Sequence, residues 1–142
     1  TRCLALLGIL DRSSRLLHPG AVTHPAENID WLSDNQTKGI SDRPAITLHA
    51  SAEFSERNWE VPTEEWAPDL ISSAQEVLGA EVISFVSHRW GFAKPIQTFG
   101  ATHYHQPAIG LTLAGDGFGG ERVERAAISG LDAADAIIEE NS

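Results

Sequence analysis

Hydrophobic positions in the first fifty residues come in short runs separated by polar stretches that contain Pro and Gly. Cys3–Leu10 is a continuous apolar run that ends at an aspartate, a pattern typical of a buried strand. Asn28–Ser33 and Ala45–Ser51 alternate between apolar and polar residues and predict two further strands. The connecting stretches, Asp11–Glu27 and Asp34–Pro44, are rich in turn-forming residues and predict loops.

The middle of the chain predicts a helix. Thr63 is expected to cap its N-terminus, and two glutamates follow in the first turn, where they suit the helix dipole. The apolar periodicity continues to Leu78 and stops at Gly79. Because Pro68 cannot donate a main-chain hydrogen bond, the regular part is expected to begin nearer Ala67.

Two shorter segments flank this helix. Glu53–Glu60 is compatible with a helical turn, and Glu81–Trp90 alternates in a way that predicts a strand with one dry face. On that strand His88 and Trp90 would project from the same side of the sheet.

The C-terminal part predicts a strand, a Gly-rich turn and a helix. Ile109–Ala114 is expected to be a short buried strand, and the turn that follows holds four glycines and Asp116. Apolar or small residues then recur at helical spacing: Val123, Ala126, Ala127, Gly130, Leu131, Ala134, Ile137 and Ile138. The helix would direct its first N–H groups at the turn, and a carboxylate at the end of a strand favours sugar or ribityl hydroxyls over phosphate. These features indicate a nucleotide site.

Together these elements predict an α+β fold, with an antiparallel or mixed sheet and one main helix followed by a strand–turn–helix unit. A chain of 142 residues has the length of one domain. Its net charge of −10 argues against nucleic acid and anionic membrane surfaces as partners. No apolar run approaches the ~18 residues of a membrane span, and Cys3 is the single cysteine, so we expect a cytoplasmic protein without disulfides.

A resemblance to a known family adds to this interpretation. The segment GDGFGGERVERAAISGLDAADAII resembles the C-terminal flavin-binding segment of the FAD-dependent amine oxidase superfamily, in particular its renalase-like branch. The similarity covers Leu111 to Ala134, and HRWGFAKP (His88–Pro95) resembles a second segment of that branch. The stretch between Cys3 and Trp59 is more loosely similar to the sheet of the family's substrate domain.

The resemblance implies an FAD site at the C-terminal turn, within the last strand–helix of a Rossmann-like FAD-binding domain. Asp116 would contact the ribityl–pyrophosphate region, and the first helical N–H groups would face the pyrimidine end of the flavin. The implied cofactor-binding residues are Gly115, Asp116, Gly119, Gly120, Arg122 and Val123. The family usually has Gly where this chain has Arg125, and we expect this cation to obstruct close packing of the cofactor.

On the substrate side, the resemblance implies catalytic roles for His88 and Trp90. The aromatic ring would wall the site, and the imidazole could transfer protons near neutral pH. The alternative is a half-buried strand with a tryptophan in the core. The expected reaction is hydride transfer to the flavin from a small-molecule substrate, either an amine or a dihydronicotinamide.

Proteins of this family open with a strand, a G-x-G-x-x-G turn and a helix, but the glycine cluster of this chain, residues 115–120, comes late and precedes the terminal helix, so the N-terminal dinucleotide-binding half is absent from the sequence. We therefore expect residues 1–108 to be part of a substrate domain and residues 109–142 to be the last strand and helix of an FAD-binding domain. Such a chain is expected to be inactive alone. The alternative is a catalytically silent fragment that self-associates or pairs with a complementary FAD-binding half.

Other chemistries find less support. His103 and His105 would share one side of a strand and could begin a metal site, but no third ligand stands at a suitable spacing, so no metal is predicted. Lys94 could stabilise charge near a flavin, although an exposed lysine is the commoner case. Neither a nucleophile elbow nor a Walker motif occurs.

Overall fold

The computed structural model describes residues 1–140. The chain forms two compact units: an N-terminal unit, Arg2–Ala93, and a C-terminal unit that begins at Lys94 and includes Thr1. The sequence-based domain boundary between residues 108 and 109 lies inside the C-terminal unit.

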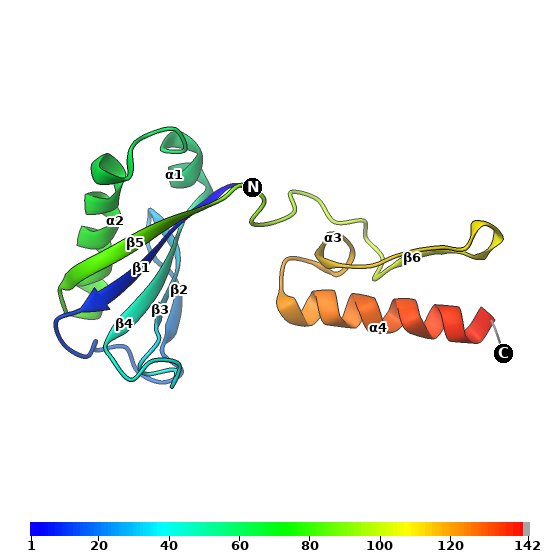
Figure 1. The fold of residues 1–142 in the computed structure, drawn as a ribbon, viewed down its shortest axis with the longest axis horizontal. Helices are drawn as coiled ribbons and strands as arrows, with labels where there is room; N and C mark the ends of the chain where they lie inside the picture. The colour runs from blue at the N-terminus through cyan, green and yellow to red at the C-terminus, as the bar shows by residue number, and fades with distance from the viewer. Residues whose placement is uncertain (141–142) are drawn as a thin grey trace. The chain divides into compact units, whose positions relative to one another are not determined.

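The N-terminal unit is an antiparallel sheet with helices on one face (Figure 1). Its strands lie in the order β2-β3-β4-β1-β5, and each neighbouring pair is antiparallel. The strands are β1 (Cys3–Leu10), β2 (Ala21–Ala26), β3 (Ile29–Asp34), β4 (Ala45–Ala50) and β5 (Val82–Trp90), and the helices are α1 (Ala52–Arg57) and α2 (Thr63–Leu78). The expected α+β class with an antiparallel sheet is confirmed.

The core lies between this sheet and α2. Alternate residues of β1, among them Leu4 and Leu6, are buried on the helix side. They belong to the same core cluster as Leu32 of β3 and Leu48 of β4. The helix contributes residues at spacings of three or four positions: Trp66, Ala67, Leu70, Ala74 and Leu78. Full burial of each leucine side chain is worth about 1.5–3 kcal/mol.

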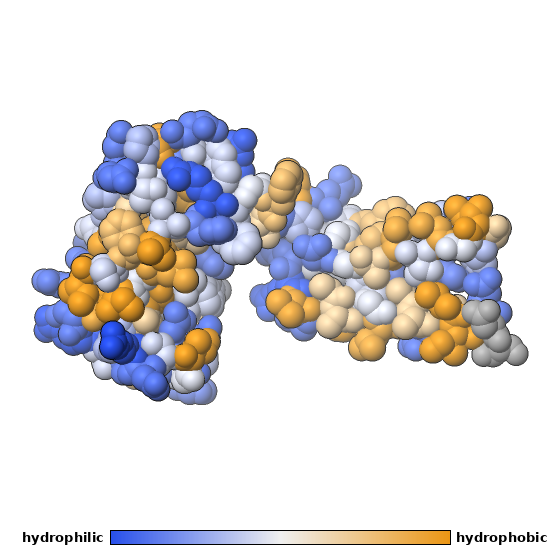
Figure 2. All heavy atoms as spheres, viewed as in Figure 1, coloured by the Kyte–Doolittle hydropathy of each residue, from blue (hydrophilic) through white to orange (hydrophobic). Residues whose placement is uncertain are grey.

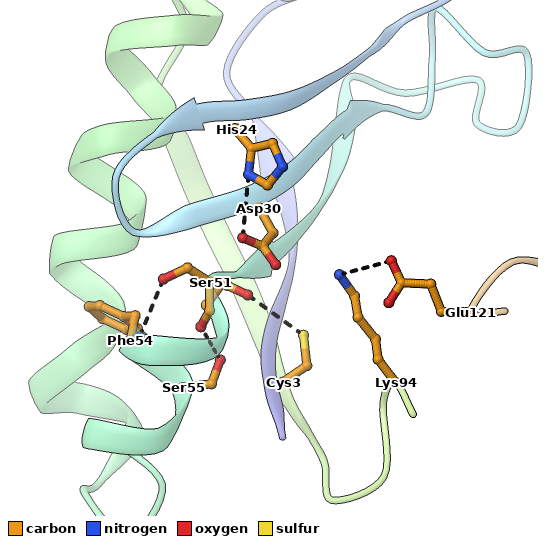
Figure 3. A network of polar contacts seen from close by, with 9 residues as sticks. Cys3, His24, Asp30, Ser51, Phe54, Ser55, Lys94 and Glu121 are labelled. Atoms are coloured by element: carbon orange, nitrogen blue, oxygen red, sulfur yellow. Dashed lines mark hydrogen bonds and ion pairs between the residues drawn. The ribbon is translucent and has the colours of Figure 1, made fainter. Parts of the chain in front are cut away.

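The helix ends in the structure differ in part from those that the sequence predicts. Ser51 caps α1: its Oγ accepts from the N–H of Phe54 (3.3 Å), and its carbonyl accepts from the Ser55 hydroxyl (2.8 Å; Figure 3). The predicted cap at Thr63 is wrong. Pro62 is the N-cap of α2, and the Thr63 hydroxyl lies 3.0 Å from Ser87 Oγ on β5.

The predicted delay of the α2 start to Ala67 is also wrong, because Pro68 lies inside the helix. A proline at this position frees the carbonyl of Glu64, and both residues are exposed, so water can satisfy that group. The predicted end is confirmed, since Gly79 is the C-cap, with φ +65°.

Two predictions about the sheet are wrong. The stretch 11–27 was expected to be a loop, but its second part forms β2, an edge strand that lacks clear alternation and pairs with β3. The strand β5 was expected to have one dry face. It is instead the opposite edge strand, and its residues are mostly exposed on both faces, with only Val82 and Ser87 half-buried.

The C-terminal unit is a hairpin followed by two helices. Its elements are β6 (Tyr104–Gln106), a 3-10 turn (Pro107–Ile109), β7 (Leu111–Leu113), α3 (Asp116–Gly119) and α4 (Val123–Glu140). The expected buried strand over Ile109–Ala114 is thus shorter than predicted, and both leucines of β7 are exposed.

The helix α4 forms as predicted but presents a different face to its unit. Ser129 and Ala133 are buried, whereas Val123 and Leu131 of the predicted apolar stripe are 87% and 66% exposed. The reason is a polar contact: the Ser129 hydroxyl accepts a hydrogen bond from the main chain of Gly115, which turns this face towards the loop. Within residues 1–140, no helix has the length and apolar character needed to cross a membrane.

Candidate functional site

The Gly-rich turn, residues 115–120, connects β7 to α4 through α3. Gly115 has φ +137° and Gly120 has φ +115°, conformations that side-chain-bearing residues rarely adopt. The N–H of Gly115 donates to Ser129 Oγ over 2.8 Å, and Ser129 is fully buried in α4. A Cβ built on Gly115 would meet no heavy atom within 4 Å. The turn is therefore anchored on one side and open on the other.

The other end of the turn lies directly on the first turn of α4. A Cβ on Gly119 would come within 2.7 Å of the Arg125 carbonyl oxygen, a distance that no side chain tolerates without movement. Glycine at this position is thus a packing requirement. It brings the main chain of the turn against the start of the helix.

Asp116 is the first residue of α3, and its side chain is exposed. Its carbonyl accepts from the N–H of Gly120 over 3.0 Å, which closes the turn. Asp116 directly follows Gly115 in the chain, and its carboxylate is accessible to solvent. In this position it can accept hydrogen bonds from the hydroxyls of a ligand.

The start of α4 lacks a side-chain acceptor of its own. The Arg122 carbonyl accepts from the N–H groups of Arg125 and Ala126, each at 3.0 Å, which makes Arg122 the residue that precedes the helix. A guanidinium only donates, so it cannot cap the first N–H groups. Val123 and Arg122 are both exposed.

Charged side chains surround this end of the helix. Lys94 Nζ lies 3.9 Å from Glu121 (Figure 3), and Arg122 lies 3.7 Å from Glu124. The Arg125 side chain runs along the turn, because its Cγ would be 3.8 Å from a Cβ on Gly120. The aliphatic part of the Arg125 side chain thus already lies against the turn. Obstruction of the cofactor by Arg125 therefore depends on the direction of its guanidinium group.

The second predicted pair, His88 and Trp90, lies on β5 in the N-terminal unit. Their rings contact each other edge to face, with centroids 4.3 Å apart. Both residues project from the face of the sheet that α1 and α2 do not cover, which we call the open face. Arg89 projects to the other face, where its guanidinium donates to the carbonyls of Trp59 and Val61.

The register of the sheet brings two further aromatic groups to the open face. Ala5 of β1 pairs with His88 on one side and with His49 of β4 on the other. His49 in turn pairs with Trp31, and their ring centroids are 5.3 Å apart. Sequence analysis missed His49 and Trp31 as neighbours of His88. The alternation of each strand marks its face, but the antiparallel register that aligns the strands is a tertiary property.

His105 of β6 and His103, which precedes this strand, belong to no larger cluster of potential ligands among the described residues. His105 Nδ1 lies 2.9 Å from Thr112 Oγ1, and its Nε2 lies 3.1 Å from Glu140. His103 Nδ1 is 3.3 Å from Thr102 Oγ1. Among residues 1–140, no group of three or more potential metal ligands comes together.

A surface depression of about 580 Å³ lies on the N-terminal unit. Its lining is mostly polar: Ala26, Glu27, Asn28, Ser51, Glu53, Phe54, Arg57, Asp69, Ser72 and Ser73. None of these residues was predicted to act in binding or catalysis.

The predicted cofactor-binding residues thus lie together in the C-terminal unit, and the predicted catalytic residues lie together in the N-terminal unit. No model of a known protein family matches this chain.

Proposed function

We propose that this chain is the C-terminal portion of a renalase-like, FAD-dependent oxidoreductase. In this proposal the Gly-rich turn and the start of α4 hold the ribityl and pyrophosphate region of FAD, and the open face of the sheet meets the substrate. The observation that carries the proposal is the main chain at Gly115. It has a glycine-only conformation, an anchor on a buried serine and open space beside it.

The residues of the turn fit such a group. A Cβ on Gly115 would project into the open space, so glycine leaves room there for close approach of a ligand to the main chain. Asp116 would accept hydrogen bonds from ribityl hydroxyls, and the first N–H groups of α4 would donate to oxygens of the flavin or its phosphates.

When bound, the flavin would supply the chemistry by accepting a hydride from an amine or a dihydronicotinamide. The residues of this chain would position the flavin and the substrate. Trp90 offers an exposed aromatic wall, and the ring nitrogens of the exposed His88 beside it can hydrogen-bond to the substrate.

The exposed apolar side chains support a role as part of a larger assembly. Val123 and Leu131 lie on one helix, and Leu111 and Leu113 lie on β7, all exposed within the described residues. In the proposal these side chains pack against the remainder of an FAD-binding domain. The chain alone would then bind FAD weakly and would not turn over substrate.

The test is an equilibrium titration of the full chain with FAD, followed by flavin fluorescence. We expect FAD to bind weakly. FMN should compete with FAD and AMP should not, because the turn would contact the part of FAD that FMN shares. Asp116→Ala should weaken binding at least fivefold, whereas Asp135→Ala, the same charge change at an exposed position of α4, should not.

Arg125→Gly should leave binding unchanged or tighten it. Equal affinity of the Asp116→Ala variant and the unmodified chain would contradict the proposed site. Weaker binding by Arg125→Gly would contradict the interpretation of this residue as an obstruction.

The alternative proposal is a catalytically silent chain that associates with itself or with a complementary half. The same exposed apolar side chains favour it. The titration separates the two, because a silent association module has no reason to bind FAD at Asp116.

A further inference from the structure

The sheet of the N-terminal unit has two edges that differ in their capacity to pair. At one edge, β2 contains Pro25, which has no N–H to donate, and His24, which has φ +49°. Its register with β3 also shifts between Thr23 and Ala26. Prolines and irregularities of this kind prevent another strand from adding to an edge. The β2 edge is thus protected against the addition of a further strand.

The opposite edge has no comparable protection. The strand β5 is nine residues long, contains neither Pro nor Gly, and pairs only with β1 among the described residues. Ile83 and Val86 are 62% and 64% exposed, and Phe85 and Trp90 are exposed as well. Apolar atoms gather over this part of the unit (Figure 2). A long, exposed, apolar edge strand is a template for a further strand.

We propose that β5 pairs in antiparallel fashion with β5 of a second copy of this chain, which joins two five-stranded sheets into one. The register shift near Ile83 ends the regular ladder at one end, so the pairing is centred on Val86 and runs over Ser84–His88. This register places Val86 opposite its own copy and Ser84 opposite His88 of the copy. The inference does not rest on flavin binding.

A second copy suits this edge because its chemistry is self-complementary. His88 and Arg89 are the only ionisable residues of β5, and in this register neither faces its own copy. The Arg89 guanidinium is also held by carbonyls of the α1–α2 connection. Low charge at the edge matters in a chain of net charge −10, whose copies repel one another elsewhere.

The open face extends the contact beyond the main chain. Leu7 pairs with Val86 across β1 and β5, and it is exposed on the same face. In the dimer a continuous apolar row would run from Leu7 through both copies of Val86 to the other Leu7. A depression of about 450 Å³ beside this row, lined by Leu7, Ile9, Ser84 and Val86 among others, offers room for side chains of the copy. One strand pair is a small interface, so we expect a dissociation constant in the micromolar range.

Sedimentation velocity of the full chain over a range of concentrations tests the proposal. The sedimentation coefficient should rise with concentration. Val86→Lys, which sets two cations opposite each other at an exposed position, should weaken dimerisation at least tenfold. Thr23→Lys, the same substitution at the exposed part of the β2 edge, should leave it unchanged. Circular dichroism confirms that each variant is folded.

Cross-linking gives a second readout that does not depend on a destabilising variant. Val86→Cys should form a covalent dimer under mild oxidation, because its copy lies directly opposite, whereas Thr23→Cys should not. The native Cys3 is buried and common to both variants. A chain that stays monomeric at every concentration would overturn the proposal and leave the edge to a strand of another protein. Equal cross-linking of the two cysteine variants would overturn it as well.

Discussion

Asp34 is the residue whose environment departs most from that of an ordinary surface carboxylate. It is 1% exposed at the end of β3. Its Oδ2 accepts from the Ser14 hydroxyl (2.5 Å), and its Oδ1 accepts from the N–H groups of Gln36 (2.8 Å) and Thr37 (2.9 Å). Burial acts to raise the pKa of this carboxyl, but the hydrogen bonds from Ser14, Thr37 and Gln36 outweigh it and hold the pKa below 3.8.

This geometry predicts a pH-dependent stability. Because the pKa of Asp34 is lower in the folded chain than in the unfolded one, its contribution is complete above about pH 5 and is lost as the pH falls through the folded-state pKa. Asp34→Asn should therefore lower the free energy of unfolding by about 1.5–3 kcal/mol at neutral pH. The difference from the unmodified chain should shrink in acid.

Tryptophan fluorescence during urea unfolding measures this effect, since all four tryptophans lie in the N-terminal unit. Asp42→Asn, at an exposed position of the following loop, is the control and should show no such loss. A stability difference that stays constant down to about pH 2 would show that the Asp34 carboxylate contributes nothing as an anion.

At the scale of elements, the contact between the Gly-rich turn and α4 organises the C-terminal unit. Two glycines of α3 differ sharply in their surroundings. A Cβ on Gly119 would lie 2.7 Å from the main-chain oxygen of Arg125, whereas a Cβ on Gly117 would meet nothing within 4 Å. Packing therefore requires glycine at position 119 but not at position 117.

Gly119→Ala should push the turn away from α4 at a cost of about 1–3 kcal/mol, because the atom it would strike belongs to the main chain. Hydrogen exchange of the α4 amides, followed by mass spectrometry, should become faster in this variant. Gly117→Ala should exchange like the unmodified chain. Equal exchange in all three proteins would mean that the turn is not packed on the helix.

The elements that sequence analysis predicted best are those with a strong local signal. The apolar run of β1 and the alternation of β4 identify these strands, and Gly79 marks the end of α2. By contrast, β2 has no regular alternation because it is an irregular edge strand. The inward face of α4 was mispredicted because a buried hydrogen bond from Gly115 to Ser129, rather than hydrophobicity, sets its rotation.

In the candidate site, too, the features with a local sequence signal were predicted and those that depend on tertiary contacts were not. The glycines and Asp116 form the predicted turn before a helix, and His88 and Trp90 share a face as alternation requires. The role of Ser129 as an anchor and the alignment of His49 and His88 on either side of Ala5 depend on contacts between elements far apart in the sequence. No spacing rule reveals such contacts.

At the scale of the whole molecule, the chain combines two compact units that both leave apolar side chains uncovered. In the N-terminal unit they include side chains at the β5 edge and on the open face, and in the C-terminal unit they include side chains of α4 and β7. A net charge of −10 keeps such surfaces from uncontrolled association. We therefore propose a partner for each surface: a second copy at β5, and the remainder of a flavin domain at the C-terminal unit.

We propose that the Gly-rich turn binds FAD, and an amide chemical-shift map shows whether it does. The full chain, labelled with ¹⁵N, is titrated with FAD, and its two-dimensional NMR spectrum is followed to saturation. We predict that the largest shifts fall on Gly115–Gly120, Arg122 and Val123, and that Asp116→Ala needs at least fivefold more FAD to reach half of its largest shift. A spectrum that does not change, or shifts confined to the N-terminal unit, would contradict the claim.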